Sequence, residues 1–213
     1  MRVVIAGGHG KVALLLERLL AGRGDQPVGL IRNPAQAADV QNAGADAVVC
    51  DLEAASADDV AVVLSGADAV VFAAGAGAGS GVPRKDSVDR AASVLMADAA
   101  ERAGVARFVQ ISSMGAGQPP QPGSGEVWAA YITAKTAAED DLRSRDLDWT
   151  SCAPATSPTP PPPPRSGSQP RPSPLAPSPA PTSPRSSRPC SMSRVPRTRR
   201  LSWSAETAPS TPL

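Results

Sequence analysis

The sequence has few cysteines, few aromatic residues and no long apolar run. Three cysteines among 213 residues, with no CxxC pair, exclude a disulfide framework and are typical of a protein in a reducing cytosol. No apolar run approaches the roughly 20 residues that span a bilayer, so we expect no membrane partner. Aromatic residues make up only 3% of the chain, and so few stacking side chains disfavour nucleic-acid binding. The sequence predicts no metal site.

Proline and charge are distributed unevenly about residue 150. Residues 151–213 hold 18 of the 24 prolines and carry a net charge of +7, whereas residues 1–150 carry −6. The first part is rich in Ala, Val and Leu and can bury a core. The second part has too few large apolar residues to offset the entropy cost of ordering its backbone. We therefore expect a folded domain over 1–150 and a disordered Pro/Ser/Arg-rich tail over 151–213.

Strand and helix patterns alternate through the first part. Strands are predicted at 2–6, 27–32, 46–51, 68–75, 106–113 and from 147 onward, and helices at 12–24, 34–44, 56–66, up to 104 and at 131–145. This alternation predicts an α/β fold of right-handed βαβ units, a doubly wound parallel sheet of the Rossmann type. Such a sheet binds ligands at the carboxyl ends of its strands.

A glycine-rich turn joins the first strand to the first helix. The segment 7–13, GGHGKVA, matches GxxGxxA in this context and predicts a dinucleotide-binding turn. Gly7 permits the tight turn, Gly10 lets the backbone approach a pyrophosphate, and the helix N-terminus offers free N–H groups to the anion. The candidate cofactor-binding residues of this turn are Gly7, Gly8, His9, Gly10, Lys11 and Val12.

The ends of the next strands supply further candidates. Arg32 and Asn33 follow the second strand, where NAD would favour an acid that binds the ribose hydroxyls. A guanidinium suits a 2′-phosphate, so we favour NADP over NAD. Asp51 and Leu52 close the third strand and are placed to flank the adenine. The small residues Ala73, Ala74 and Gly75 close the fourth strand and would let the cofactor lie against the backbone.

Three motifs together resemble the short-chain dehydrogenase/reductase superfamily. These are GxxGxxA at the start, a Ser pair after the fifth strand (Ser112 and Ser113), and YxxxK on a helix (Tyr131 to Lys135). The strand RFVQISS and the segment YITAKTAAE resemble more narrowly the atypical NAD(P)-binding members, which are related to sugar-nucleotide epimerases and NADPH-sensing proteins. The resemblance covers about residues 1–150.

The resemblance implies a reaction and a role for each residue. Residues four apart share one helix face, so Lys135 can lie beside Tyr131 through the nicotinamide ribose and lower the pKa of the phenol. Tyr131 would act as the acid/base at a carbonyl or alcohol oxygen while a hydride moves to or from the nicotinamide. Ser113, or alternatively Ser112, would hydrogen-bond that oxygen.

The resemblance also implies how the sixth strand should end. After Asp148-Trp149-Thr150 the family continues with residues like Ile-Leu-Arg-Pro-Gly, whereas this chain has Ser-Cys-Ala-Pro-Ala at 151–155. Codons for these five residues, read one base earlier, decode naturally as the family residues. We therefore predict that 151–213 arise from a one-base frameshift. A genuine Pro-rich linker, or a ligand for a proline-recognising domain, is the alternative.

Three functions remain open at this point. The first is an NADP-dependent oxidoreductase, or an epimerase-like enzyme, acting on an unidentified carbonyl, alcohol or sugar-like substrate. The second is an NADPH-sensing binder that uses the same pocket without turnover. The third is an interaction protein that acts through its Pro-rich tail.

Overall fold

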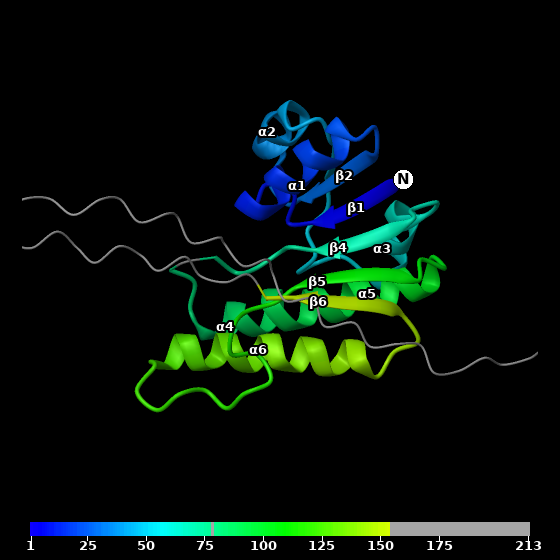
Figure 1. Ribbon diagram of the computed structural model, residues 1–213. Helices are drawn as coiled ribbons and strands as arrows, with labels where there is room; N and C mark the ends of the chain where they lie inside the picture. Colours follow the sequence, from blue (N-terminus) through cyan, green and yellow to red (C-terminus); the bar gives the residue numbers. More distant parts are fainter. Residues whose placement is uncertain (78, 154–213) are drawn as a thin grey trace, which may run out of the picture.

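A computed structural model describes residues 1–77 and 79–153 of the chain. The elements follow the predicted alternation (Figure 1). The strands are β1 (Arg2–Ala6), β2 (Gln26–Ile31), β3 (Asp46–Val49), β4 (Ala69–Phe72), β5 (Arg107–Ile111) and β6 (Asp148–Cys152). The helices are α1 (Lys11–Gly22), η1 (Pro34–Gln36), α2 (Ala37–Asn42), α3 (Ala57–Leu64), α4 (Val82–Arg84), η2 (Lys85–Ala91), α5 (Ala92–Arg102) and α6 (Glu126–Arg143).

The strands form one parallel sheet in the order β3-β2-β1-β4-β5-β6. The chain returns to the centre between β3 and β4, which places the switch point beside β1. This arrangement confirms the predicted doubly wound fold. Among the described residues β6 is an edge strand.

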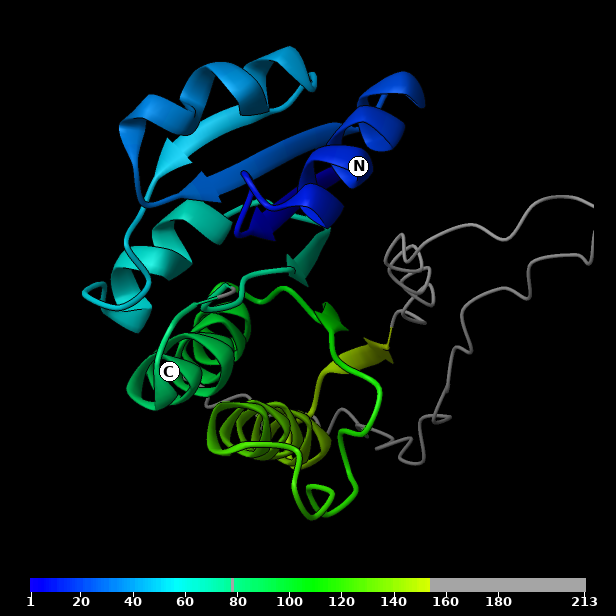
Figure 2. The same cartoon turned by 90° about the vertical axis from the view of Figure 1, so that its left-hand side faces the viewer.

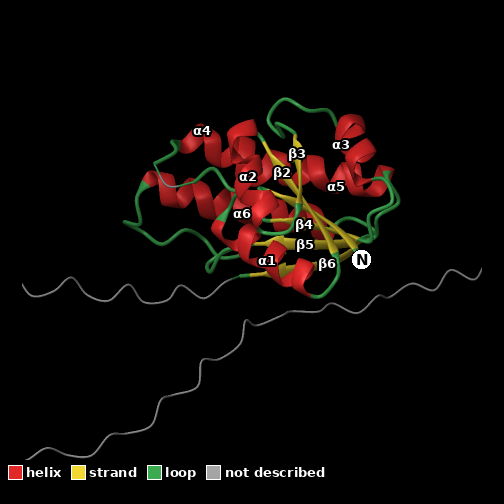
Figure 3. Ribbon diagram, turned by 90° about the horizontal axis from the view of Figure 1, so that it is seen from above, coloured by secondary structure: helices red, strands yellow, loops and turns green. Residues whose placement is uncertain are grey.

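Helices cover both faces of the sheet (Figures 2 and 3). Figure 2 shows α1 and α2 on one face and α3, α5 and α6 on the other. Alternate residues of β1 face the two layers, because successive side chains of a strand point to opposite faces. Val4 packs with Val60, Met96 and Leu142 in the larger core, and the residues of the second core are Val3, Ile5, Ala13, Leu20, Ala69 and Val71.

Three boundaries differ from the sequence prediction. Helix α6 begins at Glu126, earlier than the predicted start at Tyr131. The long helix up to 104 is divided, since Lys85–Ala91 forms a π-helical segment between α4 and α5. Strand β6 continues through Cys152, past the predicted domain boundary at 150, because Gln110 and Ile111 pair with Ser151 and Cys152. The rest of the predicted tail lies outside the described residues.

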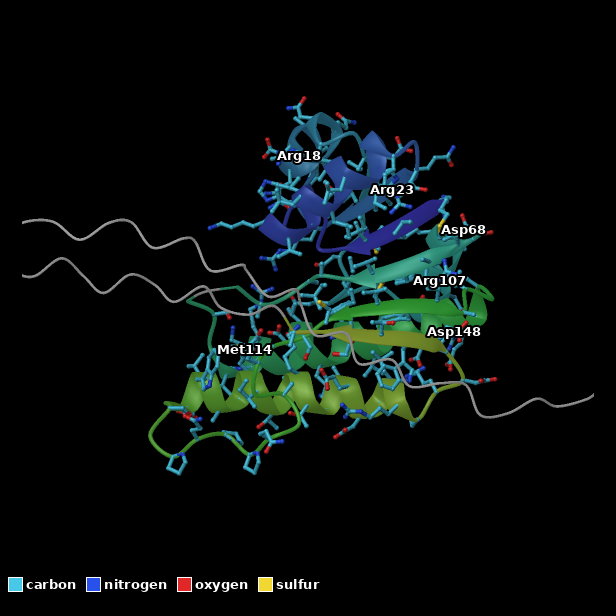
Figure 4. All side chains as sticks on the ribbon, viewed as in Figure 1. Arg18, Arg23, Asp68, Arg107, Met114 and Asp148 are labelled. Atoms are coloured by element: carbon cyan, nitrogen blue, oxygen red, sulfur yellow. The ribbon has the colours of Figure 1, made fainter. Side chains whose placement is uncertain are left out.

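The loops that follow the carboxyl ends of the strands carry the candidate site residues. Figure 4 shows Asp68, Arg107 and Asp148, at or just before the starts of their strands, along one edge. Met114, which follows β5, lies at the opposite edge. That opposite edge, formed by the carboxyl ends of the strands, is where the site is built.

Candidate functional site

The glycine-rich turn fits closely between β1, β2 and β4. Gly7 has a φ of +76°, and a Cβ there would lie 2.7 Å from the Cα of Ala74. A Cβ on Gly8 would lie 2.7 Å from the Cα of Gly29, and Gly8 N–H donates to the carbonyl of Leu30 at 2.9 Å. Side chains at these positions would therefore push the turn off the sheet.

The N-terminus of α1 is open to an anion. Gly10 is its N-cap, makes no side-chain capping bond, and precedes a first turn without acidic residues. The first N–H groups of a helix lack partners within the helix and attract negative charge. The turn and helix therefore fit the pyrophosphate of a dinucleotide, which these residues would hold by backbone N–H groups.

A cavity of about 380 Å³ extends from this turn across the ends of β2, β3 and β4. Most of the predicted cofactor-binding residues line it, namely Gly7, His9, Gly10, Arg32, Asp51, Leu52, Ala73, Ala74 and Gly75. The remaining predicted residues lie outside it. Gly8 is the buried residue of the turn, and Lys11 and Val12 are exposed on α1. Asn33 accepts a hydrogen bond from Ala35 N–H at 3.0 Å.

Two arginines meet one carboxylate at the edge of this cavity. Glu53 Oε2 accepts from Arg84 at 2.6 Å and lies 3.3 Å from Arg32, while Ser87 Oγ donates to Glu53 Oε1 at 2.6 Å. The Ser87 hydrogen bond and the two guanidinium charges lower the pKa of Glu53. No local pattern in the sequence indicated Glu53, Arg84 and Ser87, because residues 53 and 84 meet only in the folded chain.

A second, wider cavity of about 890 Å³ continues from the loop after β4 to α6. Tyr131, Lys135 and Ser112 line it. Ser113 does not line it and is hydrogen-bonded to the Tyr131 phenol, so the structure brings both serines close to the predicted Tyr–Lys pair. Lys135 Nζ lies 5.9 Å from the centre of the Tyr131 ring and donates to the carbonyl of Ile111 at 3.2 Å. Trp128 packs beside Tyr131, with ring centres 5.4 Å apart.

The surroundings of the Tyr131 phenol raise its pKa. Burial is the largest cause, a hydrogen bond with Ser113 opposes the rise, and the Asp89 charge adds to it. The Lys135 ammonium lies 3.4 Å from the buried Asp89 carboxylate, and its predicted effect on the phenol, which acts through the nicotinamide ribose, stays a prediction. Burial lowers the pKa of Lys135, and Asp89 opposes that shift.

The two serines lie in different surroundings. Ser113 is hydrogen-bonded to the Tyr131 phenol and also donates to the carbonyl of Met114 at 3.3 Å. Ser112 is buried, lines the wider cavity, and its hydroxyl has no hydrogen-bond partner within residues 1–77 and 79–153. The geometry therefore keeps both serines as candidates for the residue that contacts a substrate oxygen.

Two charged residues of the π-helical segment complete this cavity and were missed from the sequence. Asp89 is 1% exposed, and its Oδ2 accepts from Ala76 N–H at 3.2 Å. Lys85 is 8% exposed and donates to the carbonyl of Gly77 at 3.0 Å. Their spacing of four residues, on one face of a predicted helix, is the signal that could have indicated them.

Within the described ranges, no group of His, Cys, Asp or Glu side chains is arranged to hold a metal ion. The helices of the same ranges include none that is long and apolar enough to cross a bilayer. Cys50 is a free thiol.

The parallel sheet, the glycine turn and the Tyr–Lys cavity define a dinucleotide-binding Rossmann protein. Comparison with known proteins identifies the family. The chain belongs to the NAD(P)H-binding family, whose model matches residues 7–168.

Relatives in three organisms support this membership. A UPF0659 protein of Schizosaccharomyces pombe is 33% identical over 170 residues, which cover 71% of this chain and 69% of the relative. The uncharacterized sugar epimerase YhfK of Bacillus subtilis is 30% identical over 155 residues, covering 72% and 71%. A Bacillus halodurans structure with the provisional name NAD-dependent epimerase/dehydratase has a TM-score of 0.65 at 35% identity, covering 72% and 70%.

Proposed function

We propose that this protein is an NADP-dependent oxidoreductase that moves a hydride to or from a carbonyl or alcohol substrate. The observation that carries the proposal is the wider cavity, where Tyr131 and Lys135 stand on one face of α6 beside the Ser pair. This cavity shares Ala73, Ala74, Gly75 and Gly77 with the cavity of the glycine turn. A dinucleotide bound at the turn could therefore extend toward Tyr131.

The cation at the end of β2 supports NADP over NAD. Arg32 occupies the position where an acid would favour NAD, and 56% of its side chain is exposed. Arg84 brings a second guanidinium to the same carboxylate, Glu53. A 2′-phosphate is an anion that could take the place of Glu53 between these cations.

The residues of the wider cavity suit the reducing direction. The Tyr131 phenol is protonated at neutral pH, since its ordinary pKa is about 10 and burial raises it, so the phenol can donate a proton to the carbonyl oxygen as the carbonyl carbon gains a hydride. The bound nicotinamide supplies that hydride. Ser112 or Ser113 orients the carbonyl oxygen by a hydrogen bond, and Lys135 places positive charge beside the developing alkoxide.

Substitution of Tyr131 by Phe tests the reaction. We expect Tyr131→Phe to lower kcat for NADPH oxidation by about 100-fold or more, because the proton donor is lost. NADPH affinity should stay unchanged, since the phenol oxygen is assigned to the substrate. Absorbance of NADPH measures the rate with a panel of carbonyl compounds, and calorimetry measures the affinity. Ser144→Ala, at the far end of α6, is the matched control.

The alternative is a sensor that binds NADPH without turnover. The Asp89–Lys135 ion pair favours it, because an amine held by a carboxylate is less available to a substrate or ribose. A wild-type protein that binds NADPH but oxidises it with no member of the panel would support the sensor and contradict the enzyme. The predicted role of the Pro-rich tail lies outside the described residues.

A further inference from the structure

A second lysine shares the wider cavity with the Tyr–Lys pair. Lys85 begins the π-helical segment η2, is 8% exposed, and lines the cavity together with Tyr131 and Lys135. Its ammonium lies 5.4 Å from the centre of the Tyr131 ring and uses one donor on the carbonyl of Gly77. Two of its three donors remain for another group.

The buried charges around this cavity do not balance. The buried carboxylate, Asp89, is paired with Lys135 at 3.4 Å and accepts from Ala76 N–H. Within the described part of the chain, Lys85 has no carboxylate at ion-pair distance, and the other acid of the lining, Glu126, is solvent-exposed. A buried ammonium without a counter-charge is unfavourable in a low-dielectric site. The three buried charges of the lining therefore have an excess of one positive charge, and the exposed Glu126 makes the lining as a whole neutral.

The rest of the lining is largely apolar. Ile111 lies at the end of β5, and Val127 and Trp128 come from the first turn of α6. Val127 and Trp128 are 44% and 46% exposed. An apolar ligand body would cover both of them.

We propose that Lys85 binds the carboxylate of an oxo- or hydroxy-acid substrate whose apolar body lies against Val127 and Trp128. This inference rests on the proposed function and narrows its substrate to a class. An excess of one positive charge among the buried groups matches a monoanion. Lys85 contacts none of the reacting atoms in this scheme, so it determines specificity and takes no part in the hydride or proton transfer.

A binding experiment tests the inference without requiring turnover. The probes are 3-phenylpropanoate and its amide, which share shape and differ in charge. Isothermal titration calorimetry measures both, with and without saturating NADPH. We expect the acid to bind wild-type protein about tenfold or more tightly than the amide, because an ammonium–carboxylate hydrogen bond is worth more than a neutral one.

Three variants assign the preference to Lys85. Lys85→Met keeps the length of the side chain and should remove the acid preference, while Lys85→Arg should retain it. Arg90→Met is the matched control, because Arg90 lies on the same segment, pairs with Asp86 and does not line the cavity. It should keep the preference.

The outcomes separate the two proposals. Equal affinity for acid and amide, no binding of the acid, or a Lys85→Met variant that keeps the preference would overturn the carboxylate site. A Lys85→Met variant that loses NADPH affinity but keeps the acid preference would also overturn the carboxylate site. Absence of NADPH binding by wild-type protein would contradict the proposed function alone, since the probes are also measured without NADPH.

Discussion

Glu17 is a buried carboxyl group beneath the glycine-rich turn. It is fully buried, and a Cβ placed on Gly29 would approach its Oε1 to 2.6 Å. Neither carboxyl oxygen has a hydrogen-bond partner in the described ranges. Burial raises the pKa of Glu17 to about 7, although Arg18 and His9 act in the opposite direction.

The raised pKa of Glu17 predicts that stability falls as pH increases. Folded Glu17 holds its proton up to about pH 7, whereas the unfolded residue loses it near 4.5, so the folded state binds more protons between these values. The free energy of unfolding should therefore drop by roughly 2–3 kcal/mol from pH 4.5 to above pH 7. Urea unfolding at a series of pH values measures the drop.

Glu17→Gln should remove most of that pH dependence, because the amide does not titrate. For each protein, the stability at one pH is compared with the stability at another pH. A change in absolute stability caused by the substitution therefore does not affect the comparison. A Glu17→Gln protein with the same loss of stability between pH 5 and pH 8 as wild type would contradict this role for Glu17.

Residues that follow a strand end could be predicted from the sequence, and residues that meet across the fold could not. The glycine turn and Arg32 are each marked by a local pattern. The Asp89–Lys135 and Glu53–Arg84 contacts join residues 46 and 31 positions apart, and both depend on how the segment after β4 folds back. For the same reason, Asp89 was not expected beside Lys135.

At the scale of a single element, the local sequence was sufficient to predict where helix α3 begins. Ser56, the first residue of the helix predicted at 56–66, is its N-cap, and the structure has a capping box in which Ser56 Oγ accepts from Asp59 N–H at 3.2 Å. Asp59 accepts in return from Ser56 N–H at 3.0 Å. By contrast, the π-helical turn at Lys85–Ala91 has no comparable signal, since its residues also suit an α-helix.

Ser56→Ala should destabilise the protein by about 1 kcal/mol, because Asp59 N–H in the first turn of α3 loses its Ser56 Oγ acceptor. The midpoint of urea unfolding at neutral pH measures the change. Ser65→Ala, at the exposed C-terminal end of the same helix, should shift it by no more than about 0.5 kcal/mol. Equal effects at the two ends would show that the capping box is not the source.

At the scale of the whole molecule, the doubly wound parallel sheet was predicted from the alternation of strands and helices, and the structure confirms it. The end of the last strand was not predicted. Strand β6 runs to Cys152, and a 2.6 Å hydrogen bond from Ser151 Oγ to Glu139 holds it. The frameshift over 151–213 stays a prediction. Sequencing the gene across codons 148–156 decides it, and one intact frame in independent isolates would contradict it.

The central claim, a site for NADP formed by the glycine turn and Arg32, is tested most directly by titrating the purified protein with NADPH and NADH. Calorimetry or nicotinamide fluorescence gives both affinities under the same conditions. We predict that NADPH binds about tenfold or more tightly than NADH, because a charge-assisted contact between Arg32 and the 2′-phosphate is worth about 1.5–3 kcal/mol. Binding of neither nucleotide, or NADH binding as tightly as NADPH, would contradict the claim.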